Sequence, residues 1–243
     1  MKKIWIFIIL SSLLFAKSSL DNNQIIRDFS GFDRVYIPTL YFTSIGKLEK
    51  AKDSMKTLRI RWDAFSEKYK MANPEDIRWV DSFKWIESNM MQVEQIVKSS
   101  GDLNEAHELL EGINNVFVSL RKRNNISYYP DRLTEFHRPM DLMVSGLKGI
   151  IPENVSKKDR ELVSNNIQVA SVLWNEIEVT EFDNSLFGLQ SEQLEMMRKY
   201  IAEEKNNLRQ VKSALQQDNA KLLKTVSSLK QGFAKVYLMF GEF

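Results

Sequence analysis

Residues 38–69 read PTLYFTSIGKLEKAKDSMKTLRIRWDAFSEKY, and the apolar side chains in this stretch recur three, four or five residues apart. Spacing of this kind places them on one side of an α-helix, where they form a single stripe that can be buried. The stretch therefore predicts one long helix from Pro38 to Tyr69. The stripe consists of Leu40, Ile45, Leu48, Ala51, Met55, Leu58, Trp62 and Phe65.

The rest of the chain repeats this pattern. Asn73 and Pro74 provide an N-cap and a first-turn proline, and Asp102 precedes Glu105 at the spacing of a capping box. Only nine glycines and five prolines are present, which is typical of a helical protein. Residues 17–34 are polar and mixed, and they predict a flexible lead-in. We expect further helices at about residues 74–99, 103–123, 130–148, 156–181, 189–216 and 219–240.

These segments predict an all-α fold, an antiparallel helical bundle of about seven helices joined by short turns. Short segments of the sequence also recur, and we call this recurrence the echo. Val97-Lys98-Ser99 recurs 114 residues later as Val211-Lys212-Ser213, and Trp62 has a counterpart 112 residues later in Trp174. The echo has two interpretations, an internal repeat or chance similarity between amphipathic helices.

An internal repeat would divide the chain into two related three-helix halves. The expected N-terminal half spans residues 35–149, and the expected C-terminal half spans residues 156–243. The helix at 130–148 would connect the two halves, and residues 150–155 form the clearest linker in the sequence.

The first sixteen residues indicate where the protein works. Lys2 and Lys3 precede an apolar run over residues 4–15, and Ala16 supplies a small residue for cleavage. The run is shorter than the roughly 20 apolar residues that a membrane-spanning helix needs. It therefore predicts a signal peptide at 1–16, export to the periplasm, and no stable membrane anchor after cleavage. The alternative is an uncleaved N-terminal anchor.

Composition excludes several classes of function. No cysteine is present, which excludes disulfides, covalently attached haem, iron–sulfur clusters, thiolate zinc sites and cysteine nucleophiles. Removal of residues 1–16 takes away two of the 34 basic side chains, so 32 basic side chains remain against 32 acidic ones. A balanced charge does not favour nucleic acid or an anionic membrane as a partner.

Histidine and methionine offer one candidate metal site. His137, Met140 and Met143 follow one another at intervals of three residues, and residues at that interval can share a helix face. An imidazole with thioethers favours Cu(I), although Met143 lies about 120° around the helix from His137. Non-covalent haem b is the related alternative, held between His137 and either Met90 or Met91. The competing interpretation is that both cofactors are absent and the methionines fill the core.

The chain has only two histidines, His107 and His137. If their helices form an antiparallel hairpin, the two residues lie roughly 15 Å apart along its axis. Two ligands of one ion lie about 2 Å from it, so we expect no shared metal site. His107 and Glu111 are four residues apart on one helix face, a spacing that favours a surface contact.

The turn at residues 124–139 combines aromatic and charged groups, and functional residues concentrate at such corners. Asp141 is four residues beyond His137 and could raise the pKa of that histidine. The candidate interaction corner consists of Tyr128, Tyr129, Asp131, Arg132, Glu135, Asp141 and His107.

No hydrolase signature or glycine-rich phosphate loop is present. The sequence therefore favours a non-enzymatic, exported, soluble binding or accessory protein. It would act through a protein partner or a small ligand, with helix faces and the corner as its surface. The alternative is a periplasmic protein that binds copper or haem b. The apolar end at residues 236–243 is expected to dock on the bundle or to bind a partner.

Overall fold

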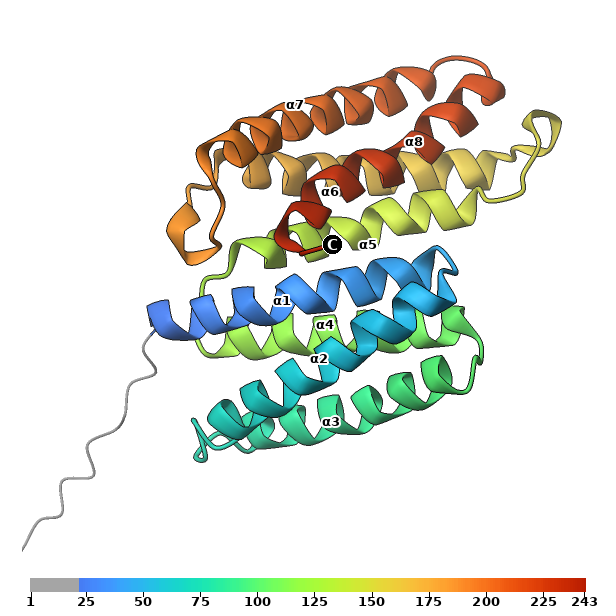
Figure 1. Cartoon of the computed structure of the whole chain (residues 1–243). Helices are drawn as coiled ribbons and strands as arrows, with labels where there is room; N and C mark the ends of the chain where they lie inside the picture. Colours follow the sequence, from blue (N-terminus) through green and yellow to red (C-terminus); the bar gives the residue numbers. More distant parts are fainter. Residues whose placement is uncertain (1–21) are drawn as a thin grey trace, which may run out of the picture.

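The computed structural model describes residues 22–243, and within that range the chain forms eight α-helices and no strand (Figure 1). The predicted all-α helical bundle is confirmed. The predicted signal peptide at 1–16 lies outside the described residues. The helices are α1 (Asn22–Ser44), α2 (Leu48–Tyr69), α3 (Ile77–Lys98), α4 (Leu103–Arg123), α5 (Tyr129–Gly146), α6 (Lys157–Val179), α7 (Ser191–Ala214) and α8 (Asn219–Tyr237). Three short 3-10 helices are η1 (Pro152–Asn154), η2 (Asn184–Leu186) and η3 (Leu238–Phe240).

The helices form two stacked four-helix bundles (Figure 1). In the first bundle α1 packs on α2 and α4, and α3 packs on α2 and α4; in the second, α5 to α8 repeat this arrangement. The expected three-helix halves are therefore wrong, because the helix taken as a connector is the first helix of the second bundle. The bundles divide at residues 124–128, while residues 150–155 join α5 to α6 inside the second bundle.

Residues 22–34 form part of α1, so the predicted flexible lead-in is wrong over that range; residues 17–21 lie outside the described part. Ile25, Phe29 and Phe32 are buried in the first core. These residues continue a helical stripe through Tyr36. The polar side chains between them made the segment resemble a tether, although two of them, Ser30 and Asp33, are themselves buried.

The single helix predicted from Pro38 to Tyr69 is divided between α1 and α2. Gly46 has a positive φ of 67°, a backbone conformation that glycine adopts without steric cost. Its N–H donates to the Thr43 carbonyl (3.2 Å), and the Lys47 N–H donates to the Phe42 carbonyl (2.9 Å). This pair of bonds is the Schellman motif that ends α1.

Pro38 lies inside α1 and links that helix to the C-terminal residues. Proline has no N–H, so the Arg34 carbonyl lacks its donor from within the helix. The N–H of Glu242 donates to that carbonyl instead, at 2.8 Å. The ring of Phe243 packs edge-on against Tyr41. The apolar end therefore docks on the chain's own first helix, one of the two outcomes expected for it.

The two bundles repeat one internal feature. Trp62 of α2 and Trp174 of α6 are both fully buried. The indole N–H of Trp62 donates to the Glu87 carboxylate on α3, and that of Trp174 donates to the Ile201 carbonyl on α7 (2.9 Å). Each tryptophan thus ties the second helix of its bundle to the third, which agrees with the 112-residue echo.

Among the described helices, none combines the length and the apolar character that a membrane span requires.

Candidate functional site

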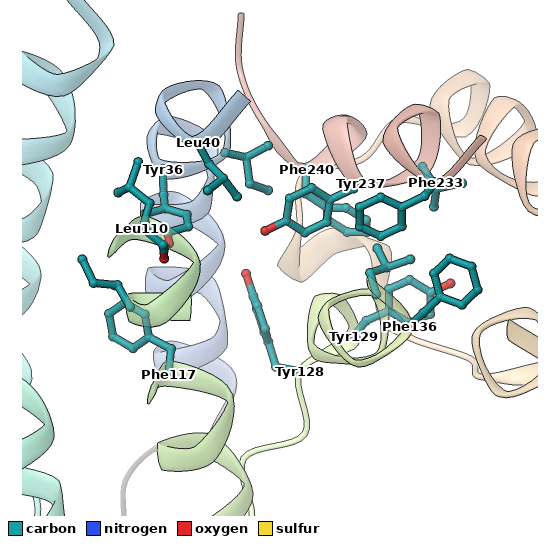
Figure 2. Packing of buried hydrophobic residues seen from close by; sticks show 14 of the residues in the cluster. Tyr36, Leu40, Leu110, Phe117, Tyr128, Tyr129, Phe136, Phe233, Tyr237 and Phe240 are labelled. Atoms are coloured by element: carbon teal, nitrogen blue, oxygen red, sulfur yellow. Dashed lines mark hydrogen bonds between the residues drawn. The ribbon is translucent and has the colours of Figure 1, made fainter. Parts of the chain in front are cut away.

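Polar side chains gather where α1 and α4 of the first bundle meet α5 and α8 of the second, a contact that we call the bundle seam. Figure 2 shows Tyr36 of α1, Tyr128 just before α5, and Tyr237 of α8 reaching into this region among apolar side chains. The Asn114 amide donates to the Thr134 hydroxyl (3.0 Å) and to the Tyr237 hydroxyl (3.3 Å) across the seam. The seam therefore combines polar contacts with apolar packing that continues from one bundle into the other.

A buried ion pair lies at the centre of the seam. The Nε of Arg121, on α4, donates to both carboxylate oxygens of Asp131, on α5, at 3.0 Å. The guanidinium carbon lies 4.5 Å from the ring centres of both Phe29 and Tyr128. Its Nη1 is buried and finds no hydrogen-bond partner in the described part of the chain. The two bundles are thus joined by a charge pair that is removed from water.

Asp33 of α1 extends this pair into a network. The Tyr128 hydroxyl donates to Asp33 Oδ2 at 2.6 Å. Burial raises the pKa of the Asp33 carboxyl to about 6, although the positive charge of Arg121 and the bond from Tyr128 act in the opposite direction. One guanidinium therefore faces two buried carboxyl groups, Asp33 and Asp131.

Part of the predicted interaction corner is buried inside the fold. Tyr128, Tyr129 and Asp131 are buried, because the second bundle packs over the turn that carries them. Arg132 pairs with Glu176 of α6 at 3.3 Å, and Glu135 pairs with Lys122. Three of the corner residues are therefore part of the buried fold, and a binding role for the corner stays a prediction.

Both histidines meet at one carboxylate. The Nε2 of His107 lies 3.2 Å from Glu111 Oε1, and the Nε2 of His137 lies 3.8 Å from the same oxygen. The separation of roughly 15 Å expected between the two histidines is therefore wrong for their imidazole rings. Glu111 lies one turn nearer the α4–α5 connection than His107, which shortens the axial gap by about 6 Å, and the side chains span the remainder.

The surroundings of the three groups fix their orientation. The Nδ1 of His107 lies 3.2 Å from the Leu40 carbonyl oxygen of α1, and the His137 ring packs against Phe233 of α8, with ring centres 5.2 Å apart. Burial lowers the pKa of His137, against the opposing effect of Glu111 and Asp141. Burial acts to raise the pKa of Glu111, but the bond from His107 and the nearby positive groups outweigh it and lower that pKa.

The predicted copper ligands lie in different surroundings, and copper binding by them stays a prediction. Met140 and Met143 are fully buried in the hydrophobic core, whereas the His137 imidazole faces Glu111 at the seam. In the described part of the chain, no group of three or more His, Cys, Asp or Glu side chains is placed so that it could hold a metal ion.

The predicted haem ligands are separated by the fold. Met90 is buried in the core on α3, and Met91 of the same helix is exposed. His137 belongs to α5 of the other bundle. These residues therefore cannot bind the two faces of one haem.

A further buried charge lies in the second bundle. Glu204 of α7 is fully buried; its Oε2 accepts from the Asn207 amide at 2.8 Å, and its Oε1 finds no partner among the described residues. Burial raises the pKa of this carboxyl to about 8. Gly232 of α8 provides the space for it, because a Cβ at that position would lie 1.7 Å from Oε2.

Sequence reasoning missed the buried charges Asp33, Arg121 and Glu204, although the sequence carries a signal for them. Glu204 interrupts the buried series on α7 formed by Met197, Ile201, Leu208 and Val211. Arg121 is one turn beyond Phe117 on the buried face of α4. A charge at a core position of a helical stripe is unusual, and that position marks a residue which needs a partner.

Comparisons with protein-family models, curated proteins and solved structures find no match for this chain. Its fold and seam define it structurally as a tandem four-helix-bundle protein.

Proposed function

We propose that this chain is an exported, non-enzymatic binding or accessory protein, and that it contacts a protein partner through the outer face of α6. The observation that carries the proposal is a set of exposed valines on that helix. Val169, Val172 and Val179 are 52%, 59% and 74% exposed. Their spacing of three and seven residues aligns them on one face, opposite the core face that carries Trp174.

Exposed valines lower the stability of a helix unless a partner covers them. A β-branched residue loses side-chain freedom in a helix, and at an exposed position valine is up to about 0.7 kcal/mol less favourable than alanine. Single exposed apolar residues are ordinary, but an aligned set resembles the apolar centre of an interface. This face therefore suits a partner that presents an apolar surface.

Charge beside the stripe further defines the partner. Ser171 and Asn175 of α6 line a surface hollow together with Arg209 and Lys212 of α7. Positive side chains at the edge of an apolar patch favour a partner with acidic groups at the matching place, because such complementarity guides association. The proposed partner is a protein segment with an apolar face and an acidic border.

Site-specific photo-crosslinking in the native host tests this proposal. A crosslinking residue at Val172 should give one defined adduct, which the double change V169E/V179E removes. Ile60, on α2, is 73% exposed and provides the matched position on the first bundle. The same adducts from both positions, or no adduct from Val172, would contradict the proposal.

Export is part of the proposal and has a separate test. Fractionation of the native host followed by N-terminal sequencing should find the mature chain in the periplasm, beginning just after Ala16. A chain that retains Met1 in the cytoplasm would contradict export.

A further inference from the structure

We infer that the hollow between α6 and α7 binds a compact anion with two negative charges, of the phosphate and phosphate-monoester class. The hollow has a volume of about 320 Å³ and lies where these two helices pack side by side. The inference goes beyond the proposed protein partner and does not rest on it, because the exposed valines occupy the neighbouring face of α6.

The lining of the hollow carries positive charge and no negative charge. Lys205, Arg209 and Lys212 come from α7, at intervals of four and three residues that place them on one side of the helix. The α6 side contributes a serine, a tryptophan and an asparagine, none of which is acidic. The whole chain has 34 basic and 32 acidic side chains, so this local excess does not follow from the composition.

Two of the three positive charges have no partner. Lys205 forms an ion pair with Glu178 of α6. Within residues 22–243, the side chains of Arg209 and Lys212 make no ion pair or hydrogen bond. The residues three and four positions away from either of them on α7 include no carboxylate. The hollow therefore offers two uncompensated positive charges to a ligand.

The arrangement of these charges is unfavourable for the helix by itself. Like charges three or four residues apart on a helix destabilise it. The helix dipole accounts for Lys212, because that residue lies in the last turn of α7, where a cation is favourable. It does not account for Arg209, which lies before that turn. A bound anion would offset the repulsion between the two side chains.

The types of donor select the class of anion. The Arg209 guanidinium can donate two parallel hydrogen bonds to phosphate or carboxylate oxygens, and the Lys212 ammonium adds a point charge. The side-chain amide of Asn175 has two N–H groups, and it has no partner among the described residues. A phosphate group brings three acceptor oxygens and nearly two charges at neutral pH, whereas a carboxylate brings two oxygens and one charge.

The base of the hollow is apolar and held in place. Trp174 and Leu208 line it and are buried, and the Trp174 indole N–H is fixed by its bond to the Ile201 carbonyl (2.9 Å). Apolar surroundings reduce the local screening of charge, so an anion is attracted more strongly here than on a flat polar surface. The volume is at the small end of ligand sites, which suits a small anion.

Nuclear magnetic resonance titration of the untagged mature protein with inorganic phosphate, at constant ionic strength, tests the inference. Phosphate should shift the signals of the Asn175 side-chain amide and the Trp174 indole N–H. The Trp62 indole, buried in the first bundle, provides the internal reference and should not shift.

Variants of the two unpaired cations test which groups bind the anion. Arg209→Gln and Lys212→Gln should each raise the Kd for phosphate by at least about fivefold, because each removes a charge-assisted hydrogen bond. Both side chains are exposed, so these variants should fold as the wild type does. Arg198→Gln is the matched control, since it removes an exposed arginine of α7 outside the hollow, and it should leave the Kd unchanged.

Two further ligands define the anion. Acetate, with one charge, should bind at least about fivefold more weakly than phosphate. Tighter binding of glycerol 3-phosphate than of inorganic phosphate supports a phosphate monoester as the ligand, and equal or weaker binding supports phosphate itself. The inference is overturned if phosphate shifts neither signal at the hollow, if Arg209→Gln and Lys212→Gln bind it as tightly as the wild type, or if acetate binds as tightly as phosphate.

Discussion

His107 and His137 face one oxygen of Glu111 from helices of different bundles, at 3.2 and 3.8 Å. Neither helix alone creates this arrangement. It depends on the stacking of the two bundles, which also buries the Arg121–Asp131 pair further along the same seam. The seam is therefore the part of the molecule where folding and any chemistry of the histidines are most closely linked.

The buried ion pair gives the first prediction. Arg121→Leu should lower the free energy of unfolding by about 3–5 kcal/mol, because it leaves the buried Asp131 without a partner. Urea denaturation measures this loss. Arg61 is an exposed arginine on α2, and Arg61→Leu should change stability by less than about 0.5 kcal/mol. Similar losses in the two variants would show that the pair contributes little.

Glu204 gives a prediction about pH. Burial raises the pKa of its carboxyl from 4.5 to about 8, so the folded chain holds this proton more tightly than the unfolded chain. Its contribution to stability is therefore complete below about pH 4.5 and is lost as the pH rises to about 8, with a slope of at most about 1.4 kcal/mol per pH unit.

Glu204→Gln should remove this part of the pH dependence and leave the variant more stable than the wild type at pH 8. Urea denaturation at several pH values measures it, and Glu195→Gln, an exposed change on the same helix, should retain the wild-type profile. If wild type and Glu204→Gln lose stability in parallel between pH 5 and pH 8, the carboxyl is not the cause.

Two glycines give opposite predictions. In Gly232→Ala the new Cβ would lie 1.7 Å from Glu204 Oε2, and relief of this clash should cost about 1–3 kcal/mol. Gly31→Ala meets no atom within 4 Å and should stabilise α1 by up to about 1 kcal/mol. Thermal unfolding distinguishes them, and adding Glu204→Ala should recover part of the Gly232→Ala loss. Shifts of the same sign in both glycine variants would contradict the packing described.

The exposed valines give the fourth prediction. Val172→Ala should leave the isolated protein as stable as the wild type or raise its free energy of unfolding by a few tenths of a kcal/mol, because alanine is the better helix former. Val163→Ala on the buried face of α6 should cost about 1–3 kcal/mol. A comparable loss at Val172 in urea denaturation would show that this side chain serves the fold rather than a partner.

Local signals made much of the fold predictable. The predicted helix at 103–123 matches α4, because Asp102 caps it as expected. The helix predicted from Pro74 instead begins at Ile77, because Asp76 and not Asn73 is its N-cap. Two errors in the predicted helix boundaries came from a proline and a glycine. Pro38 resembled a helix start but lies within α1, and Gly46 ends a helix although the apolar stripe continues beyond it.

The site was less predictable, because helical periodicity fixes which face of a helix is buried and not which helices meet across a seam. The sequence suggests one hairpin for the two histidines, whereas α4 and α5 belong to different bundles. Burial of Tyr128 and Asp131 follows from that stacking, which no local pattern encodes. Only charged residues at core positions, such as Glu204, left a signal in the sequence.

Photo-crosslinking from Val172 in the native host tests the central claim, a partner-binding face on α6, most directly. The account predicts one defined adduct that the double change V169E/V179E removes. The same adduct from Ile60 on α2, or no adduct from Val172, would contradict it.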